Sequence, residues 1–178
     1  MKEKKICLVG MPSSGKSTIG RLLAAHLGMK FIDLDEVIAK KEGMSISDIF
    51  RIKGESYFRE SERKHLLSLI QENSVFILAT GGGTPCFFDN MEIMNKYAIT
   101  IYLNISVEDL FKKLSKKGTS HRPLLQNMSD DELYQELKSK FKAREIYYNA
   151  AQICLSQHFS SVTERVNAVI DAIVALEK

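Results

Sequence analysis

The segment KKICLVGMPSSGKSTIGRLLAAHLG, residues 4–28, constrains the fold more than any other part of the chain. An apolar run, Ile6–Val9, stops at a glycine, and a short loop with a proline, two serines and a second glycine follows. A helical pattern over Ser17–Leu27 comes directly after this loop. A strand, a glycine-rich turn and a helix in this order predict the first unit of a parallel α/β sheet.

The same alternation continues along the chain. Four further apolar runs predict strands at Phe31–Ile32, Val75–Ala79, Ile99–Leu103 and Ile153–Leu155. Helical spacing of apolar residues covers 55–71, 130–150 and 162–173. None of the runs alternates with polar residues, which is typical of strands that helices cover on both faces. We therefore predict one α/β domain over residues 1–178, with a parallel sheet between two helical layers.

Composition narrows the class of protein. The chain has 178 residues, 44% of them hydrophobic, and a net charge of +3, which is too weak to argue for nucleic acid. The three cysteines are far apart and form no CxxC, as in proteins of a reducing compartment. No run approaches the ~18 apolar residues of a membrane span, and no signal-peptide pattern occurs. We expect a cytoplasmic monomer that contacts neither membrane nor nucleic acid.

The first loop fits the phosphate-binding pattern G-x4-G-K-[ST], from Gly10 to Ser17. Glycines let the backbone curl so that successive N–H groups point at phosphate oxygens, and the following helix adds its positive N-terminal end. The lysine can reach the outer phosphates, and the serine hydroxyl suits Mg²⁺. We expect a nucleotide site made of Gly10, Ser13, Ser14, Gly15, Lys16, Ser17 and Thr18. The alternative is a plain glycine turn between a strand and a helix.

Other sequence motifs restrict the class of nucleotide-binding protein to which the chain can belong. A GTP switch needs NKxD, and the string NKYA at residues 95–98 lacks the aspartate. A motor ATPase usually has a strand that ends in acidic residues, whereas SVFILAT at residues 74–80 continues into GGG. Of the classes in which such a loop occurs, a small-molecule kinase remains.

Two aspartates follow the second predicted strand, in FIDLDEV. Their spacing of two places both carboxylates on one side of an extended chain, with Leu34 facing away. At the carboxyl edge of the sheet, Asp33 can reach Mg²⁺ at Ser17, directly or through water, and Asp35 can accept a proton from an acceptor hydroxyl or orient it. The alternative is that Asp35 only caps the next helix.

Three consecutive glycines, Gly81, Gly82 and Gly83, follow the third predicted strand. Such a run costs backbone entropy, so it indicates a place where a ligand touches the main chain, or else a flexible turn. Earlier in the chain, Arg59 lies on a predicted helix, and Glu62 follows it by three residues. At this spacing Glu62 can pair with the guanidinium and hold it in position to bind a carboxylate. Taken alone, an ion pair at the surface explains Arg59 as well.

Two more arginines are candidates for anion binding. Arg144 shares a helix face with Leu133, Leu137, Phe141 and Tyr148. A charge on such a face needs either an internal acid or an anionic ligand. Arg122 precedes a proline in the polar insert 115–129, which we predict to be a mobile lid. It can stabilise charge on a transferring phosphoryl group, or it can be a solvated loop residue.

Together these motifs resemble the shikimate kinase family over nearly the whole chain. They are GMPSSGKST, DLD at 33–35, FRESE at 58–62, TGGG at 80–83, RPLL at 122–125 and RExxY at 144–148, in this order. The resemblance implies a three-layer fold with a five-stranded parallel sheet in the order 2-3-1-4-5. It also implies transfer of phosphate from ATP to shikimate, with a substrate-binding helical segment at about 34–62.

The resemblance implies a role for each candidate. Lys16 and Ser17 serve ATP and Mg²⁺, and Asp33 supports the metal. Asp35 holds the hydroxyl that is phosphorylated, while Arg59 and Arg144 bind the shikimate carboxylate. Gly81, Gly82 and Gly83 lie against the ring hydroxyls, and Arg122 closes on ATP from the lid.

The chain departs from the family on the adenine side. Members often carry an arginine a few residues before the lid arginine, where LSKKGTSHR here leaves Lys116 or Lys117 to serve. Rival functions are another small-molecule kinase such as gluconate kinase, a nucleoside monophosphate kinase, or an ATP-binding protein without turnover.

Overall fold

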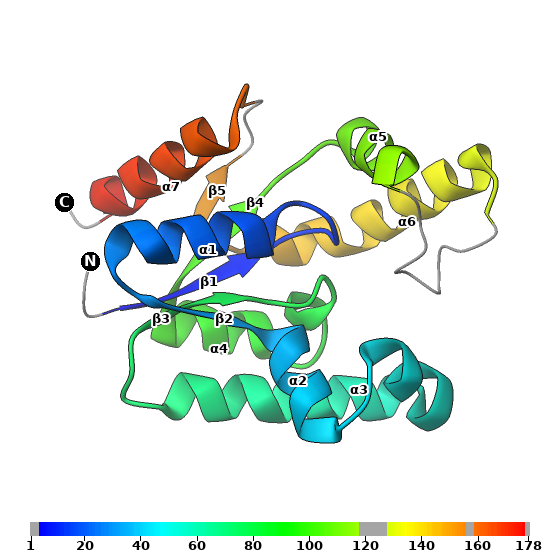
Figure 1. The fold of residues 1–178 in the computed structure, drawn as a ribbon, viewed down its shortest axis with the longest axis horizontal. Coiled ribbons are helices and arrows are strands. Elements are labelled where there is room, and N and C mark those ends of the chain that lie inside the picture. Colours follow the sequence, from blue (N-terminus) through cyan, green and yellow to red (C-terminus); the bar gives the residue numbers. More distant parts are fainter. Residues whose placement is uncertain (1–3, 118–127, 156–158, 177–178) are drawn as a thin grey trace.

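The computed structural model describes residues 4–117, 128–155 and 159–176, and within these ranges no helix is long and apolar enough to cross a membrane. Its five strands are β1 Lys5–Val9, β2 Lys30–Asp33, β3 Phe76–Ala79, β4 Ala98–Leu103 and β5 Ile153–Leu155. All neighbouring strands are parallel, in the order β2-β3-β1-β4-β5 (Figure 1). The predicted sheet and its strand order are therefore confirmed.

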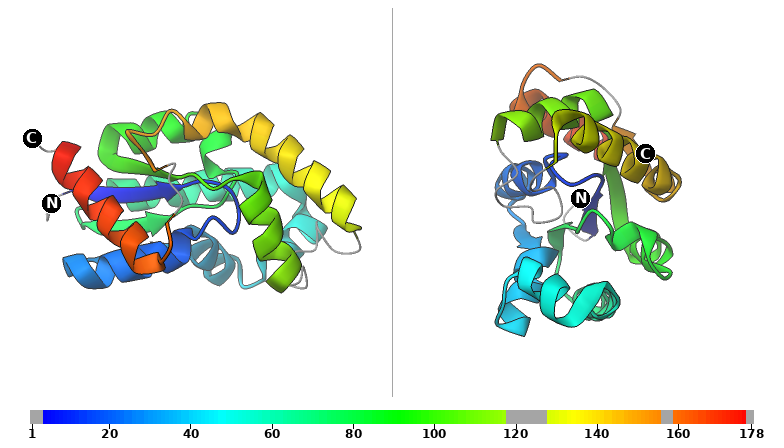
Figure 2. Two further views of the ribbon diagram at one scale, coloured as in Figure 1. Left: turned by 90° about the horizontal axis from the view of Figure 1, so that it is seen from above. Right: turned by 90° about the vertical axis from the view of Figure 1, so that its right-hand side faces the viewer.

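Helices follow the strands and cover both faces of the sheet. They are α1 Lys16–Leu27, α2 Leu34–Glu42, α3 Ile46–Gln71, α4 Asn90–Tyr97, α5 Val107–Lys117, α6 Asp130–Tyr148 and α7 Val162–Leu176, with a short 3-10 turn η1 at Thr84–Cys86. Both Figure 1 and the end view of Figure 2 show α2 and α3 on the opposite side of the loop after β1 from α5 and α6. That loop thus lies between two helical groups.

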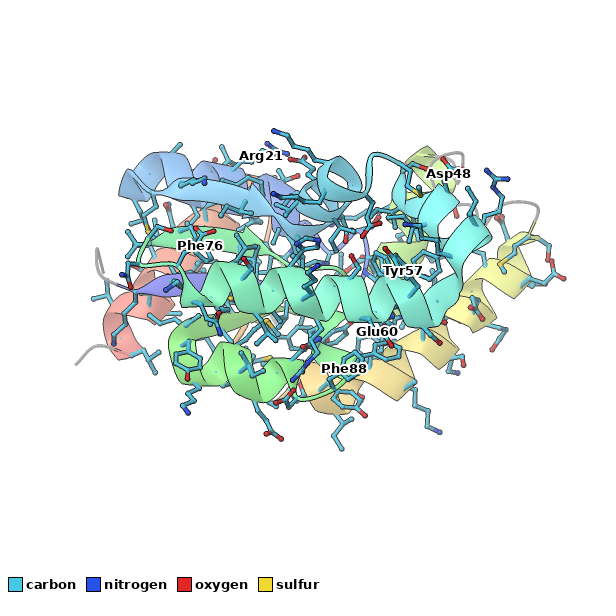
Figure 3. The ribbon with its side chains drawn as sticks, turned by 90° about the horizontal axis from the view of Figure 1, so that it is seen from below. Arg21, Asp48, Tyr57, Glu60, Phe76 and Phe88 are labelled. Atoms are coloured by element: carbon cyan, nitrogen blue, oxygen red, sulfur yellow. The ribbon has the colours of Figure 1, made fainter. Side chains whose placement is uncertain are left out.

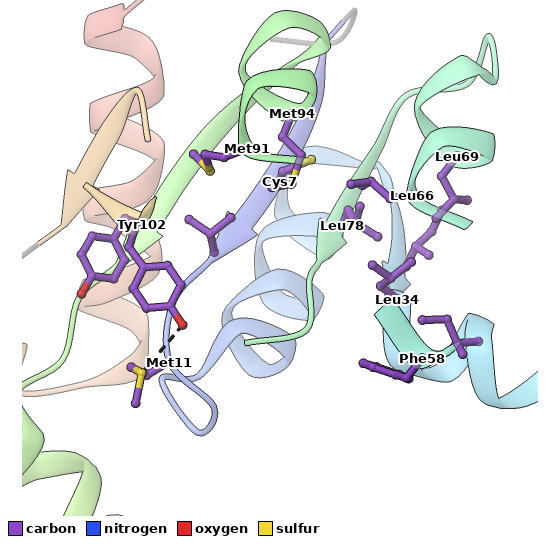
Figure 4. Close-up of a cluster of buried hydrophobic side chains, with 14 of the residues drawn as sticks. Cys7, Met11, Leu34, Phe58, Leu66, Leu69, Leu78, Met91, Met94 and Tyr102 are labelled. Atoms are coloured by element: carbon purple, nitrogen blue, oxygen red, sulfur yellow. Dashed lines mark hydrogen bonds between the residues drawn. The ribbon is translucent and has the colours of Figure 1, made fainter. Parts of the chain in front are cut away.

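Strand alternation divides the core into two clusters. Ile6 and Leu8 of β1 face α1 and α7, where Leu23 and Val169 are fully buried. Cys7 and Val9 face the other way, into a larger cluster that includes Leu66 of α3 and Met94 of α4 (Figure 4). Because both faces are covered, the strands need the continuous apolar runs that the sequence shows.

Local signals explain several element ends. Ser45 caps α3 by accepting a hydrogen bond from Asp48 N, and Ser129 and Glu132 form a capping box at α6. The helix predicted over 55–71 is the second of two helices that meet at Gly54, whose φ is 84°, and the first of them, which the sequence pattern did not predict, extends α3 back to Ile46. In Figure 3 Asp48 marks the first of these helices, and Tyr57 and Glu60 mark the second. The helical segment that the resemblance implied near 34–62 corresponds to α2 and the first part of α3. The sequence pattern did not predict α4.

The first helix can approach the sheet closely because residue 20 is glycine. Gly20 is buried in the middle of α1, and a Cβ there would lie 2.5 Å from Cε2 of Phe31 and 3.2 Å from Cδ1 of Leu8. Phe31 also contacts Arg21, whose guanidinium carbon lies 4.7 Å from the centre of its ring.

We expect Gly20→Ala to lower the free energy of unfolding by about 1 kcal/mol. Overpacking costs roughly 1–3 kcal/mol, and better helix propensity returns about 1 kcal/mol. Urea unfolding measures the change, and the double variant Gly20→Ala, Phe31→Leu should recover most of it, because the shorter side chain relieves the clash. A single Gly20→Ala variant that is more stable than the wild type would contradict the close packing.

Candidate active site

The loop between β1 and α1 has the geometry of a phosphate-binding loop. Gly10 and Gly15 have φ values of 139° and 101°, which only glycine adopts without strain. Ser14 is fully buried, and its Oγ has no hydrogen-bond partner among the described residues. The Lys16 ammonium donates to the carbonyls of Gly10 and Met11 at 2.8 and 2.9 Å, so its charge is held across the loop.

A residue that the sequence analysis missed braces this loop from α7. The Arg165 guanidinium donates to the carbonyl of Ser14 at 2.9 Å and to the carbonyl of Asn104, after β4, at 3.1 Å. Burial lowers the pKa of Arg165. With Phe159 it lines a cavity of about 910 Å³ beside the loop. The available signal was a charge next to Val166 on an otherwise apolar helix stripe, the same signal that singled out Arg144.

Asp33 connects the loop to the second strand. Ser17 Oγ donates to its Oδ2 at 2.7 Å, and the Asp35 amide donates to its Oδ1 at 3.1 Å. Strand β2 ends at Asp33 and α2 begins at Leu34, so the prediction that both aspartates extend from one strand was wrong. Asp33, and not Asp35, caps the helix. The alternative in which Asp35 acts only as that cap is therefore excluded.

Asp35 is a buried carboxyl in a charged environment. Its pKa is raised to about 6, mainly by burial and then by the negative charges of Glu62 and Asp33, while Lys16 and Arg59 act in the opposite direction. Its Oδ1 is buried and has no hydrogen-bond partner within the described ranges. Such an oxygen is costly unless a ligand supplies a donor. The carboxyl can thus accept a hydrogen bond or a proton from a hydroxyl group.

Arg59 is buried, so its interpretation as a surface ion pair was wrong. Its Nη1 donates to the fully buried Glu62 at 2.9 Å, and its Nε and Nη2 donate to Glu55 at 3.2 and 3.0 Å. The ring of Phe87 lies 4.2 Å from the guanidinium carbon. The guanidinium is therefore fixed on several sides.

Glu62 is in turn held by the loop after β3. Thr84 Oγ1 donates to Glu62 Oε1 at 2.6 Å, and Asn90 Nδ2 donates to the Thr84 carbonyl at 2.9 Å. All three residues are buried. This chain of hydrogen bonds orients the carboxylate that orients Arg59.

The three glycines after β3 are explained by close approach. None of them has a positive φ. A Cβ at Gly81 would lie 2.5 Å from Glu62 Oε1, one at Gly82 would lie 2.6 Å from the ring of Pro12, and one at Gly83 would lie 2.6 Å from Arg59 Nη1. The glycine loop therefore packs directly on the first loop, on Arg59 and on Glu62.

Arg144 is half-buried on α6 and approaches the same region. Its positive charge acts on Cys86 and on Tyr148, and the charge of Arg59 acts on both as well. Within the described part of the chain, Arg144 has no ion pair with an acid. Of the two explanations for this charge, an anionic ligand is the one the geometry favours.

The predicted site residues that the structure describes thus converge at one edge of the sheet. Arg122 and most of the predicted lid lie outside the described residues. The other residues surround an oxygen acceptor, Asp35, with a phosphate-binding loop on one side and arginines on the other.

Comparison with known proteins identifies the family. The model of the shikimate kinase family matches residues 12–174. A shikimate kinase of Sulfurihydrogenibium is 38% identical over 92% of this chain and 98% of its own length, and one of Clostridium botulinum (strain 657) is 40% identical over 93% and 95%.

Solved structures agree. The shikimate kinase of Bacteroides thetaiotaomicron superposes with a TM-score of 0.88 at 33% identity, covering 96% of this chain and 98% of its own. The shikimate kinase of Acinetobacter baumannii, in complex with shikimate, superposes with a TM-score of 0.87 at 31% identity. The match covers 97% of this chain and 93% of that one. A gluconokinase of Sinorhizobium meliloti gives only 0.58 at 15% identity, which shows a shared fold and nothing more. On its motifs, its strand order and these matches, the chain belongs to the shikimate kinase family.

Proposed function

We propose that the chain transfers the γ-phosphoryl group of ATP to a ring hydroxyl of shikimate, giving ADP and shikimate 3-phosphate. The observation that carries this proposal is Asp35. Its buried, unpartnered oxygen lies within the electrostatic reach of Lys16 in the nucleotide loop and of Arg59 in the acceptor region. A shikimate hydroxyl that binds Asp35 is therefore close both to this carboxylate, which can accept its proton, and to the γ-phosphate of ATP in the nucleotide loop.

On the nucleotide side, the proposed contacts are Gly10, Ser13, Ser14, Gly15, Lys16, Ser17 and Thr18. The Ser17 hydroxyl and the Asp33 carboxylate, 2.7 Å apart, fit Mg²⁺, which prefers oxygen ligands and usually binds through one or two carboxylates plus phosphates and water. When bound, Mg²⁺ neutralises charge on the transferring phosphate. Lys16 adds a compact positive charge at the outer phosphates.

On the acceptor side, Arg59 and Arg144 bind the carboxylate, and the backbone of Gly81, Gly82 and Gly83 faces the ring hydroxyls. Support comes from the fixed guanidinium of Arg59 and from the absence of an ion-pair partner for Arg144 among the described residues. The segment near 34–62 forms one wall of this site. The lid at 115–129, the role of Arg122, the cytoplasmic location and the monomeric state stay predictions.

The first test is ADP release by the purified protein with ATP and Mg²⁺. We expect release that depends on shikimate and does not occur with gluconate or AMP. Shikimate holds its carboxylate and hydroxyls in fixed positions on a ring, whereas gluconate is an open chain and AMP has no carboxylate. ATP binding without shikimate-dependent release would mean that the acceptor site serves another ligand.

We expect Arg59→Lys and Arg144→Lys each to raise the KM for shikimate by about 10–100-fold, since each loses one planar, charge-assisted contact with a carboxylate. The KM for ATP should change far less. Arg63→Lys is the matched control, because Arg63 lies on the same helix as Arg59 but pairs with Asp89. Equal losses for both substrates would count against the carboxylate contact.

We expect Asp35→Asn to cut kcat by at least about 100-fold and yet to stabilise the fold. The folded-state pKa of about 6 lies above the reference value of 3.8, so the stability that this carboxyl contributes is full below about pH 4 and is lost as pH rises through 6. The variant should therefore gain about 1–3 kcal/mol at pH 8 and almost nothing at pH 4.

Urea unfolding at the two pH values checks this difference, with the exposed Asp171→Asn on α7 as a control that shifts by less than about 0.5 kcal/mol. Near-normal turnover of Asp35→Asn would remove the carboxyl from the reaction. An equal gain at both pH values would show that its charge is not the cause.

A further inference from the structure

Tyr148, the last residue of α6, is fully buried where the two halves of the site meet. Its hydroxyl donates to the carbonyl of Gly82 at 2.5 Å, and the sulfur of Met11 lies 3.7 Å from the same oxygen. Its ring packs on that of Tyr102, with 5.1 Å between the centroids. Figure 4 shows Met11 and Tyr102 together at the end of the buried cluster, with the dashed line reaching the Met11 sulfur.

These contacts connect two loops that bind different ligands in the proposed function. Met11 belongs to the nucleotide loop, and Gly82 belongs to the glycine loop of the acceptor site. The neighbouring Pro12 packs so closely on Gly82 that a Cβ there would lie 2.6 Å from the proline ring. A displacement of either loop therefore acts on the other.

The charge of Arg144 also acts on this phenol. Arg144 lies one helical turn before Tyr148, and its positive charge lowers the pKa of the phenol, against the larger, opposite effect of burial. A hydroxyl has one proton to donate. The Tyr148 hydroxyl donates it to the Gly82 carbonyl.

We infer that the Tyr148 hydroxyl is a positioning group that fixes the Gly82 carbonyl against the nucleotide loop, and so couples acceptor binding to nucleotide binding. This inference rests on the proposed function. Tyr148 acts through the loop that it holds, so it is a positioning residue and not a catalytic one. Its effect is on the geometry of the groups that hold the acceptor.

The variant Tyr148→Phe isolates the hydroxyl, because the ring and its packing on Tyr102 remain. Tyr147→Phe is the matched control, since Tyr147 is the adjacent residue on α6 and its side chain is exposed. Calorimetry would measure the Kd for shikimate with and without MgADP for the wild type and both variants. We expect MgADP to tighten shikimate binding several-fold in the wild type and in Tyr147→Phe.

In Tyr148→Phe we expect a shikimate Kd about tenfold higher and little remaining effect of MgADP, since one buried hydrogen bond is lost. The Kd for MgADP alone should stay within about twofold, which separates this role from general loosening of the fold. An unchanged shikimate Kd in the variant, or no effect of MgADP in the wild type, would overturn the inference.

A second readout needs no shikimate, so it distinguishes failure of this inference from failure of the proposed function. Hydrogen exchange would follow the amides of residues 81–84 on addition of MgADP. If Tyr148 connects the loops, MgADP slows this exchange in the wild type and in Tyr147→Phe, and slows it much less in Tyr148→Phe. Equal protection of these amides in all three proteins would show that the Tyr148 hydroxyl does not couple the two loops.

Discussion

The site depends on close contact between the loops that follow β1 and β3. These strands are neighbours in a parallel sheet, so both loops leave the same edge, and Pro12 of one packs on Gly82 of the other. Any side chain at position 82 would separate them. With β2 on the far side of β3, Asp33 and Asp35 are brought to the same edge. The strand order thus assembles groups from three separate stretches of sequence.

This arrangement concentrates charge at a cost in stability. Burial, and after it the negative charges of Glu62 and Asp33, raises the pKa of Asp35, and the cations Lys16 and Arg59 that act in the opposite direction are themselves buried. Buried charges of this kind lower stability unless they are paired. The hydrogen bonds that Thr84 and Arg59 donate to Glu62 offset part of the cost. Among the described residues Asp35 Oδ1 still has no hydrogen-bond partner, and in the proposed function a hydroxyl group of the acceptor supplies one.

Local sequence patterns predicted much of the fold and of the candidate site. The features that they did not predict depend on packing between residues far apart in the sequence. The strand order came from the family resemblance, whereas the phosphate loop and the aspartate pair were readable directly, because each depends on residues a few positions apart. The burial of Arg59 was not readable, since it depends on Phe87 and on the glycine at position 83, both more than twenty residues away. Arg165 was missed for the same reason: its two carbonyl acceptors belong to other elements. The aspartate geometry was misjudged because Asp33 ends β2 as a helix cap, and no pattern in FIDLDEV distinguishes a cap from a longer strand.

The two acids on Arg59 differ in a way that suits ligand exchange. Glu62 is fully buried and anchored by Thr84, whereas the side chain of Glu55 is 57% exposed. Glu55 takes the Nε and Nη2 atoms, which form the edge that a carboxylate uses for bidentate binding. It directly follows Gly54, where the two helices of α3 meet at a non-helical φ of 84°. In the proposed function, a carboxylate ligand would replace Glu55 at that edge while Glu62 keeps the guanidinium in place.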